Sequence, residues 1–149
     1  MSKEMREQID RVKNWKWFLN ESANSTIYVK NIGNEYMGEL FDMADGEFYT
    51  YGKPKIGLFS GEKLIGGVLL EEEYLPSEYR FDVIIHKNFR DKGYLKLLIN
   101  KLKENFYNDK EVDQLSAMVV NKKLTKILVN KFGFNKGEFE GEDFVWINK

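Results

Sequence analysis

The order of apolar patterns in the second half of the chain constrains the fold more than any other feature. From residue 55 onward, strand-like and helix-like segments follow one another as β-β-β-α-β-α-β-β. Residues 55–59 and 64–70 flank the turn SGEK at 60–63, which is typical of a β-hairpin. Strands that alternate with helices predict an α/β (α+β) fold, in which a mixed, partly parallel central sheet is flanked by helices.

Periodicity assigns the remaining elements. Residues 79–86 and 112–120 are predicted as strands, 95–106 and 124–132 as amphipathic helices, and 134–139 and 143–148 as a final hairpin. The first half is less regular, with a helix predicted over 3–18, a short strand over 26–29 and a helix over 36–43. We expect one domain over 1–149, made of an atypical N-terminal half (1–54) and a core (55–149).

Composition removes several classes of function. The 149 residues include no cysteine and one histidine, so a disulfide, a thiolate nucleophile and a histidine-rich metal site are excluded, and no metal is expected. A net charge of −1 argues against unaided nucleic-acid binding, because proteins that bind nucleic acids are usually basic. No apolar run is long enough to cross a membrane and the first residues do not resemble a signal peptide, so we expect a cytoplasmic location and no membrane partner.

The junction between the strand at 79–86 and the next helix carries the clearest chemical signal. The strand ends at Ile85, a loop supplies Arg90 and Lys92, and Gly93 stands where the helix begins. A helix start offers unpaired backbone N–H groups and a partial positive charge, which suit a phosphate. A second reading remains open, in which Gly93 eases a tight turn and the basic side chains are simply solvated.

Taken together, the motifs resemble the GNAT superfamily of acyl-CoA-dependent N-acyltransferases. The segment RDKGYL at 90–95 is similar to that family's Arg/Gln-x-x-Gly-x-Gly/Ala loop, and it follows Ile84-Ile85-His86, which is similar to the lead-in of that loop. Asn121, an amphipathic helix and KFGF at 131–134 are similar to its second motif. The resemblance covers roughly residues 55–149.

The resemblance implies acetyl-CoA as the donor. Its pyrophosphate would lie on the loop that follows the strand, its pantetheine arm would pair with the strand where that strand diverges from residues 112–120, and Asn121 would lie near the arm or the sulfur. Asn121 is equally read as a helix N-cap. The implied cofactor-binding residues are Ile84, Ile85, Arg90, Asp91, Lys92, Gly93, Tyr94, Leu95 and Asn121.

The chain departs from the family pattern at two positions, one in the loop and one at the family's proton donor. Leu95 stands where the family prefers Gly or Ala, and the family's frequent tyrosine acid falls on Val129. A missing tyrosine is tolerable, because protonating a leaving thiolate with a pKa of roughly 8.5 is worth only about 2 kcal/mol near pH 7. Deprotonating a lysine-like amine costs nearly 5 kcal/mol, by contrast, so a base or a base-linked water is expected.

Three residues are candidates for that base. Alternation places Asp82, Ile84 and His86 on one face of the strand, and Glu78 shares this face near the strand start. The candidate catalytic residues are therefore Asp82, Glu78 and His86. Each also has a plain structural reading: a surface or hydrogen-bonded strand residue for the carboxylates, and ordinary loop structure for His86.

Three functions follow, from different classes. The first is transfer of an acetyl group to a primary amine of a small molecule or peptide, by direct attack in a ternary complex. The second is a GNAT-like module that has lost catalysis and serves binding or regulation. The third is acetylation of a nucleic-acid-linked amine such as aminoacyl-tRNA, using the lysines of residues 122–131. A homodimer is possible in this family, and the sequence does not identify the acceptor.

Overall fold

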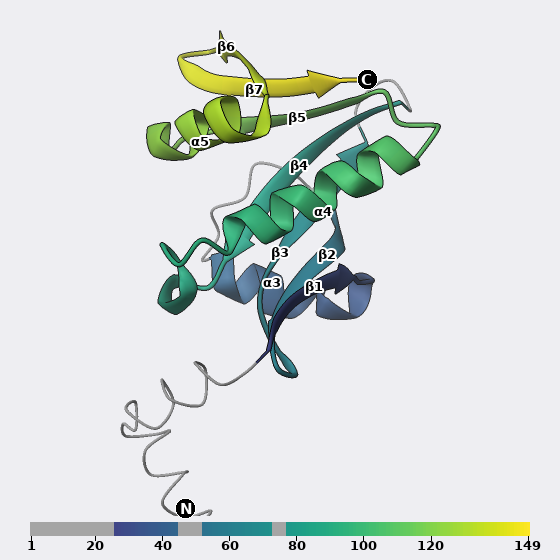
Figure 1. Cartoon of the computed structure of the whole chain (residues 1–149), viewed down its shortest axis with the longest axis vertical. Helices are drawn as coiled ribbons and strands as arrows, with labels where there is room; N and C mark the ends of the chain where they lie inside the picture. The colour runs from purple at the N-terminus through teal and green to yellow at the C-terminus, as the bar shows by residue number, and fades with distance from the viewer. Residues whose placement is uncertain (1–25, 45–51, 73–76) are drawn as a thin grey trace, which may run out of the picture.

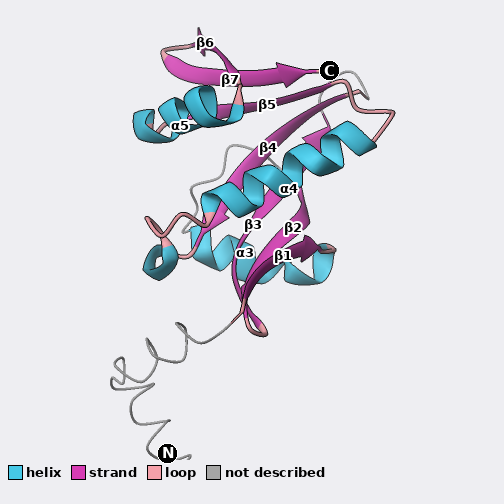
Figure 2. Ribbon diagram, viewed as in Figure 1, coloured by secondary structure: helices cyan, strands magenta, loops and turns pink. Residues whose placement is uncertain are grey.

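The computed structural model describes residues 26–44, 52–72 and 77–149, and the helix predicted over 3–18 lies outside them. Helices and strands alternate along the chain as expected (Figure 2). In chain order the elements are β1 (Ile27–Asn31), a 3-10 turn (Asn34–Tyr36), α3 (Met37–Ala44), β2 (Lys53–Ser60), β3 (Lys63–Glu72), β4 (Glu78–Ile85), a 3-10 turn (Lys87–Phe89), α4 (Leu95–Asn108), β5 (Gln114–Val119), α5 (Lys122–Phe132), β6 (Asn135–Phe139) and β7 (Glu142–Asn148).

The strands form one seven-stranded sheet in the order β1-β2-β3-β4-β5-β7-β6. Every neighbouring pair is antiparallel except β4 and β5, which run parallel. The prediction of a mixed, partly parallel sheet with the order β-β-β-α-β-α-β-β from residue 55 is therefore confirmed.

Most predicted elements differ from the observed ones by a few residues at their ends, and two of these differences are informative. The helix predicted over 36–43 begins with a 3-10 turn, and α3 itself starts at Met37. Strand β2 begins at Lys53 and so includes Pro54, which the periodicity did not assign to it. The pairing of β2 with β3 shifts between Pro54 and Ile56, and such an irregularity is where a strand accommodates a residue without an N–H donor.

The helices cover both faces of the sheet (Figure 1). Helices α4 and α5 pack over the larger core, which includes Leu98, Leu102 and Leu128, each at most 1% exposed. Helix α3 lies on the opposite face against β3 and β4, where Leu40 packs with Leu69 and Ile84. The amphipathic stripes predicted for residues 95–106 and 124–132 supply these buried contacts.

The parallel junction between β4 and β5 is short. Only Glu78, Tyr79 and Arg80 have partners in β5, whereas β5 pairs with β7 along its whole length, from Gln114 to Val119. Beyond Arg80 the two strands diverge, and the side of β4 that faces β5 is left without a strand partner there. The divergence predicted from the resemblance is therefore present, and it creates the space in which the candidate site lies.

Candidate functional site

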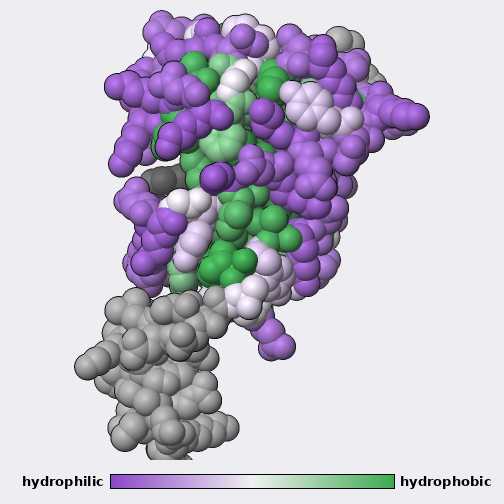
Figure 3. Space-filling view, viewed as in Figure 1, coloured by the Kyte–Doolittle hydropathy of each residue, from purple (hydrophilic) through white to green (hydrophobic). Residues whose placement is uncertain are grey.

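A cavity of about 380 Å³ lies where β4 and β5 diverge. It is bounded by the end of β4, the loop between β4 and α4, the start of α5 and the last residue of α3, and the surface between α5 and that loop is visibly indented (Figure 3). Its lining residues are Ala44, Val83, Ile84, Ile85, Phe89, Arg90, Asp91, Gly93, Tyr94, Leu95, Asn121, Lys123, Leu124 and Ile127. Apolar walls with a few polar groups at one end suit an extended ligand with a polar head.

The loop before α4 presents backbone donors to this cavity. Both Asp91 (φ 62°) and Gly93 (φ 81°) adopt the left-handed conformation, and a Cβ on Gly93 would meet nothing within 4 Å. Among the described residues, the N–H groups of Asp91, Gly93 and Tyr94 donate no hydrogen bond, and Lys92 closes the turn over residues 90 and 91. Unpaired donors at the start of a 14-residue helix make a favourable anion site.

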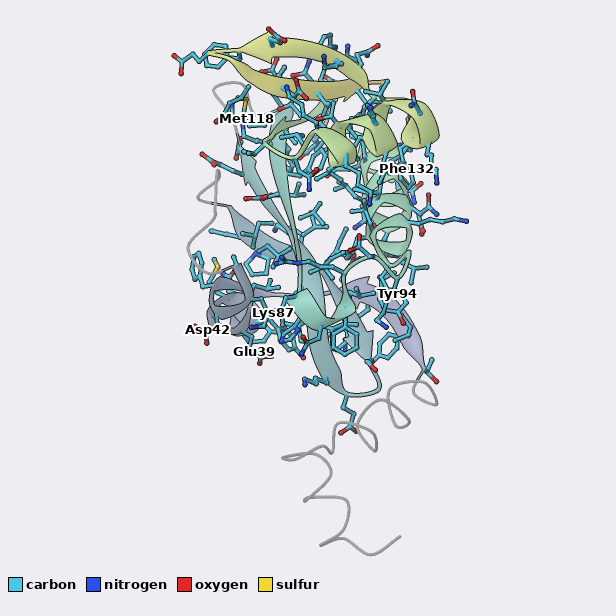
Figure 4. The ribbon with its side chains drawn as sticks, turned by 90° about the vertical axis from the view of Figure 1, so that its left-hand side faces the viewer. Glu39, Asp42, Lys87, Tyr94, Met118 and Phe132 are labelled. Carbon is cyan, nitrogen blue, oxygen red and sulfur yellow. The ribbon has the colours of Figure 1, made fainter. Side chains whose placement is uncertain are left out.

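The side chains of the predicted loop residues take different positions. The Nε of Arg90 donates to the carbonyl oxygen of Ile85 at 2.8 Å, so this arginine braces the loop while it also lines the cavity. Tyr94 lies beside the first turn of α4 (Figure 4) and is half-buried. Leu95 contacts the core, as its position in the apolar stripe predicted, but it also lines the cavity. Lys92 is exposed and is not among the lining residues.

Asn121 caps α5 and is also part of the cavity lining. Its Oδ1 accepts hydrogen bonds from the backbone N–H groups of Lys123 at 2.9 Å and Leu124 at 3.4 Å, which is an N-cap of α5. The residue also lines the cavity. The cap therefore sets the direction in which α5 leaves the cavity wall.

His86 is a capping residue in the structure and does not line the cavity. Its Nδ1 accepts a hydrogen bond from the backbone N–H of Asn88 at 3.1 Å. Burial lowers the pKa of His86 below its ordinary value of 6.5, and the nearby cations Lys63, Lys87 and Arg90 lower it further. A neutral imidazole that accepts at Nδ1 carries its proton on Nε2, so neither nitrogen is free to take a proton while the cap is intact.

The two candidate carboxylates lie on β4, outside the cavity lining. Alternation is confirmed: Val83 and Ile85 pack toward the core under α4 and α5, and Ile84 packs toward α3. Asp82 and Glu78 share the face of Ile84, and both are half-buried. Asp82 is two residues from Ile84, which places its backbone one strand repeat from the cavity wall.

Helix α5 presents apolar side chains to the cavity. Leu124 and Ile127 line it, whereas Val129, the position of the family's tyrosine, lines a separate small cavity with Asp143. The only side-chain hydroxyl among the cavity-lining residues that the structure describes is that of Tyr94. Sequence reasoning missed Lys123, Leu124 and Ile127 as lining residues, although their i, i+3 and i, i+4 spacing relative to Ile127 places them on one side of α5.

A buried charge cluster fixes the start of α5 against the last strands. Asp143, fully buried, accepts from Lys122 Nζ at 2.7 Å and from Thr125 Oγ1 at 2.8 Å, and Lys136 Nζ lies 3.8 Å away. These hydrogen bonds, first that of Lys122, hold the pKa of Asp143 below its ordinary value of 3.8. The acidic run 138–143 therefore includes one residue that anchors the start of α5, which forms a wall of the cavity.

Within the part of the chain that the structure describes, no group of acidic or histidine side chains is arranged to hold a metal ion. No helix of those residues has both the length and the apolar character needed to cross a membrane.

Comparisons with known proteins identify the fold. Neither the protein-family models nor the curated proteins give a match to the sequence. Among solved structures, an N-acetyltransferase from Staphylococcus aureus Mu50 aligns with a TM-score of 0.67 and 13% identity, over 83% of this chain and 99% of that one. The N-acetyltransferase PseH from Campylobacter jejuni, in complex with acetyl coenzyme A, aligns with a TM-score of 0.60 and 18% identity, over 83% and 99%. The aminoglycoside acetyltransferase AAC(6')-Ib, in complex with coenzyme A and kanamycin, aligns with a TM-score of 0.60 and 15% identity, over 83% and 95%.

Proposed function

We propose that this chain, whose fold is that of the GNAT N-acetyltransferases, transfers an acyl group from an acyl-CoA to a primary amine, with acetyl-CoA as the donor. The observation that carries the proposal is the cavity at the β4–β5 divergence, which brings eight of the nine predicted cofactor-binding residues together. Solved structures of similar fold contain coenzyme A or acetyl coenzyme A, which supports the choice of donor.

Different lining residues would bind different parts of the cofactor. The N–H groups of residues 91, 93 and 94 would receive the pyrophosphate, with Arg90 at the same end of the cavity. The unpaired side of β4 at Ile84 and Ile85 would hydrogen-bond the amide groups of the pantetheine arm, as a strand partner does. The apolar side chains of Val83, Leu124 and Ile127 would exclude water around the arm.

The reaction needs one bond made and one broken. The amine nitrogen attacks the thioester carbonyl carbon, the tetrahedral intermediate collapses, and the C–S bond breaks to release the thiolate. The amine nitrogen loses a proton. The thiolate takes a proton from water or from a protein group that exchanges protons with water. The chain has no cysteine, so a covalent intermediate in which a cysteine of the protein holds the acyl group as a thioester is excluded.

Asp82 is our choice for the group that accepts the amine proton, through a water molecule. It lies on the β4 face that α3 covers, and the cavity reaches this side at Ala44, the last residue of α3. Glu78 lies a further four residues back along the strand. His86 is disfavoured because its Nδ1 is occupied by the cap and its pKa is lowered.

Calorimetric titration with CoA of the wild type, Gly93→Asn and Gly93→Asp tests the cofactor assignment. Asparagine and aspartate have nearly the same size and both tolerate the left-handed backbone, so the two variants differ in one charge. A carboxylate about 4 Å from a phosphate costs roughly 1 kcal/mol per unit charge in water, which predicts at least a fivefold weaker affinity for Gly93→Asp than for Gly93→Asn. Equal affinities in the two variants would place the phosphates elsewhere.

A turnover assay tests catalysis. Acetyl-CoA with a panel of primary amines should release free CoA thiol, and Asp82→Asn should lower kcat with little change in the affinity for CoA. The competing function is a binding module without catalysis, favoured by the apolar face that α5 turns toward the cavity. Tight CoA binding without thiol release on any amine would support that module and reject the transferase.

The third function, on a nucleic-acid-linked amine, receives less support. Lys122 is held by Asp143, and Lys123 lies 3.9 Å from Asp91, so two of the lysines at the start of α5 face carboxylates. Paired lysines release fewer counterions on binding to a phosphate backbone.

A further inference from the structure

The mouth of the cavity is crossed by an ion pair between its two sides. Asp91 belongs to the loop before α4, Lys123 belongs to the first turn of α5, and Lys123 Nζ lies 3.9 Å from Asp91 Oδ1. Both residues line the cavity, and their side chains are 87% and 77% exposed. Asp91 is the only carboxylate among the lining residues that the structure describes.

The position of this carboxylate conflicts with an anionic ligand. The residues on either side of it offer N–H donors and the guanidinium of Arg90, all suited to phosphate, whereas Asp91 repels phosphate. The same carboxylate attracts Lys123, which is the one lysine among the described lining residues. Lys123, a cation that lines the cavity, therefore faces a carboxylate of the protein itself.

We propose that the Asp91–Lys123 pair is a latch that sets the affinity for the cofactor: on binding, a phosphate of the acyl-CoA takes Lys123 away from Asp91. This inference rests on the proposed function and adds to it a regulated affinity. Asp91 lowers the affinity in two ways, by direct repulsion and by holding Lys123. Lys123 raises it by contacting phosphate in the loaded state.

The two contributions are separable because only one of them requires Lys123. Removing the charge of Asp91 relieves repulsion in any background, but it frees Lys123 only where Lys123 is present. An exposed ion pair and an exposed charge repulsion are each worth about a twofold to fivefold change in affinity. Asp91→Asn keeps the left-handed backbone, since asparagine adopts it as readily as aspartate.

The test is a double-mutant cycle read by calorimetry with CoA at low ionic strength, where surface charges are least screened. The proteins are the wild type, Asp91→Asn, Lys123→Met and the double variant. Asp113→Asn and Lys126→Met make the same charge changes at exposed positions that do not line the cavity. Thermal melts check that all variants are folded.

We expect Asp91→Asn to bind CoA roughly fivefold more tightly than the wild type, and Lys123→Met to bind it roughly fivefold more weakly. In the Lys123→Met background, the gain from Asp91→Asn should shrink to about twofold. The two control variants should stay within about twofold of the wild type.

Other results overturn the latch. An equal gain in CoA affinity from Asp91→Asn with and without Lys123 would mean that Asp91 acts by repulsion alone. An unchanged affinity in Asp91→Asn would mean that Asp91 has no influence on CoA binding. Either result, obtained with a wild type that binds CoA, rejects the latch and leaves the proposed function standing. A folded wild type that binds no CoA rejects both.

Discussion

Two adjacent glycines in β3 allow a sharp test of how the sheet shapes the cavity. Gly66 pairs with Ile85 and Gly67 with Ile84, both in β4. A Cβ on Gly66 would lie 2.6 Å from the carbonyl oxygen of Ile84 and 3.3 Å from the Cα of Ile85. A Cβ on Gly67 would lie 2.7 Å from the carbonyl oxygen of Ile56, in β2, and 3.0 Å from the methyl end of the Leu40 side chain, in α3.

The two alanine variants therefore have similar strain but push in different directions. Both contacts are with backbone atoms and lie well inside the 3.4 Å at which ordinary contact begins, so a strand must shift in each variant. Such overpacking costs about 1–3 kcal/mol of the free energy of unfolding. For a chain of this size, each kcal/mol lowers Tm by roughly 2–4 °C.

Only Gly66→Ala places its Cβ against the backbone of the part of β4 that lines the cavity. If Ile84 and Ile85 receive the pantetheine arm, a shift of their backbone should weaken CoA binding by roughly tenfold, because a displacement approaching an ångström is costly in a preorganised site. Gly67→Ala, which pushes on β2, should bind CoA within about twofold of the wild type.

Thermal unfolding and calorimetry with CoA measure the two effects separately. The expected pattern is a similar loss of Tm in both variants and a loss of affinity in Gly66→Ala alone. An equal loss of affinity in both would show that affinity follows stability and not the position of β4. No loss of Tm in either would show that the glycines are not needed for the close approach of the strands.

Other predictions concern stability and titration. The pKa of Asp143 is lower in the folded protein than its ordinary value of 3.8, so its contribution to the free energy of unfolding is present above pH 3.8 and is lost as the pH falls through the folded pKa. The stability of Asp143→Asn, followed by circular dichroism, should therefore fall less steeply with decreasing pH than that of the wild type. His86, the only histidine, should titrate below 6.5 by NMR and show its proton on Nε2, and a value above 6.5 would contradict the cap. Gly38→Ala, within α3, should raise the free energy of unfolding by about 0.5–1 kcal/mol, whereas Gly133→Ala, at φ 76°, should lower it by about 1 kcal/mol, although an added Cβ has open space at both positions.

Local patterns in the sequence were sufficient for the elements of the second half. The stripe through Leu98, Leu102 and Phe106 predicts α4 because helical periodicity requires no knowledge of partners. The turn at 60–63 predicts the β2–β3 hairpin for the same reason. Pro54 was not assigned to β2 because a strand tolerates proline only at an irregular position, and that irregularity depends on the pairing with β3.

The candidate site was only partly predictable. Loop 90–95 and Asn121 carry local signals, a glycine at a helix start and an N-cap residue, and the structure brings them to one cavity. Ala44 carries no such signal, because its place in the lining depends on α3 lying across β4. The anchoring role of Asp143 was equally hidden within an acidic run, since burial separates it from its exposed neighbours only after β7 pairs with β5.

The sequence by itself determined most of the helices and strands of the second half, the place of the candidate anion-binding loop, and the chemistries that the missing cysteine excludes. These properties depend on residues close together along the chain. The tertiary structure decided that β4 and β5 pair over three residues and then diverge, that α5 turns Leu124 and Ile127 toward the opening, and that Lys123 meets Asp91 across it. Such contacts join residues about 30 positions apart, and they form only when the packing of both cores fixes the distance between the strands.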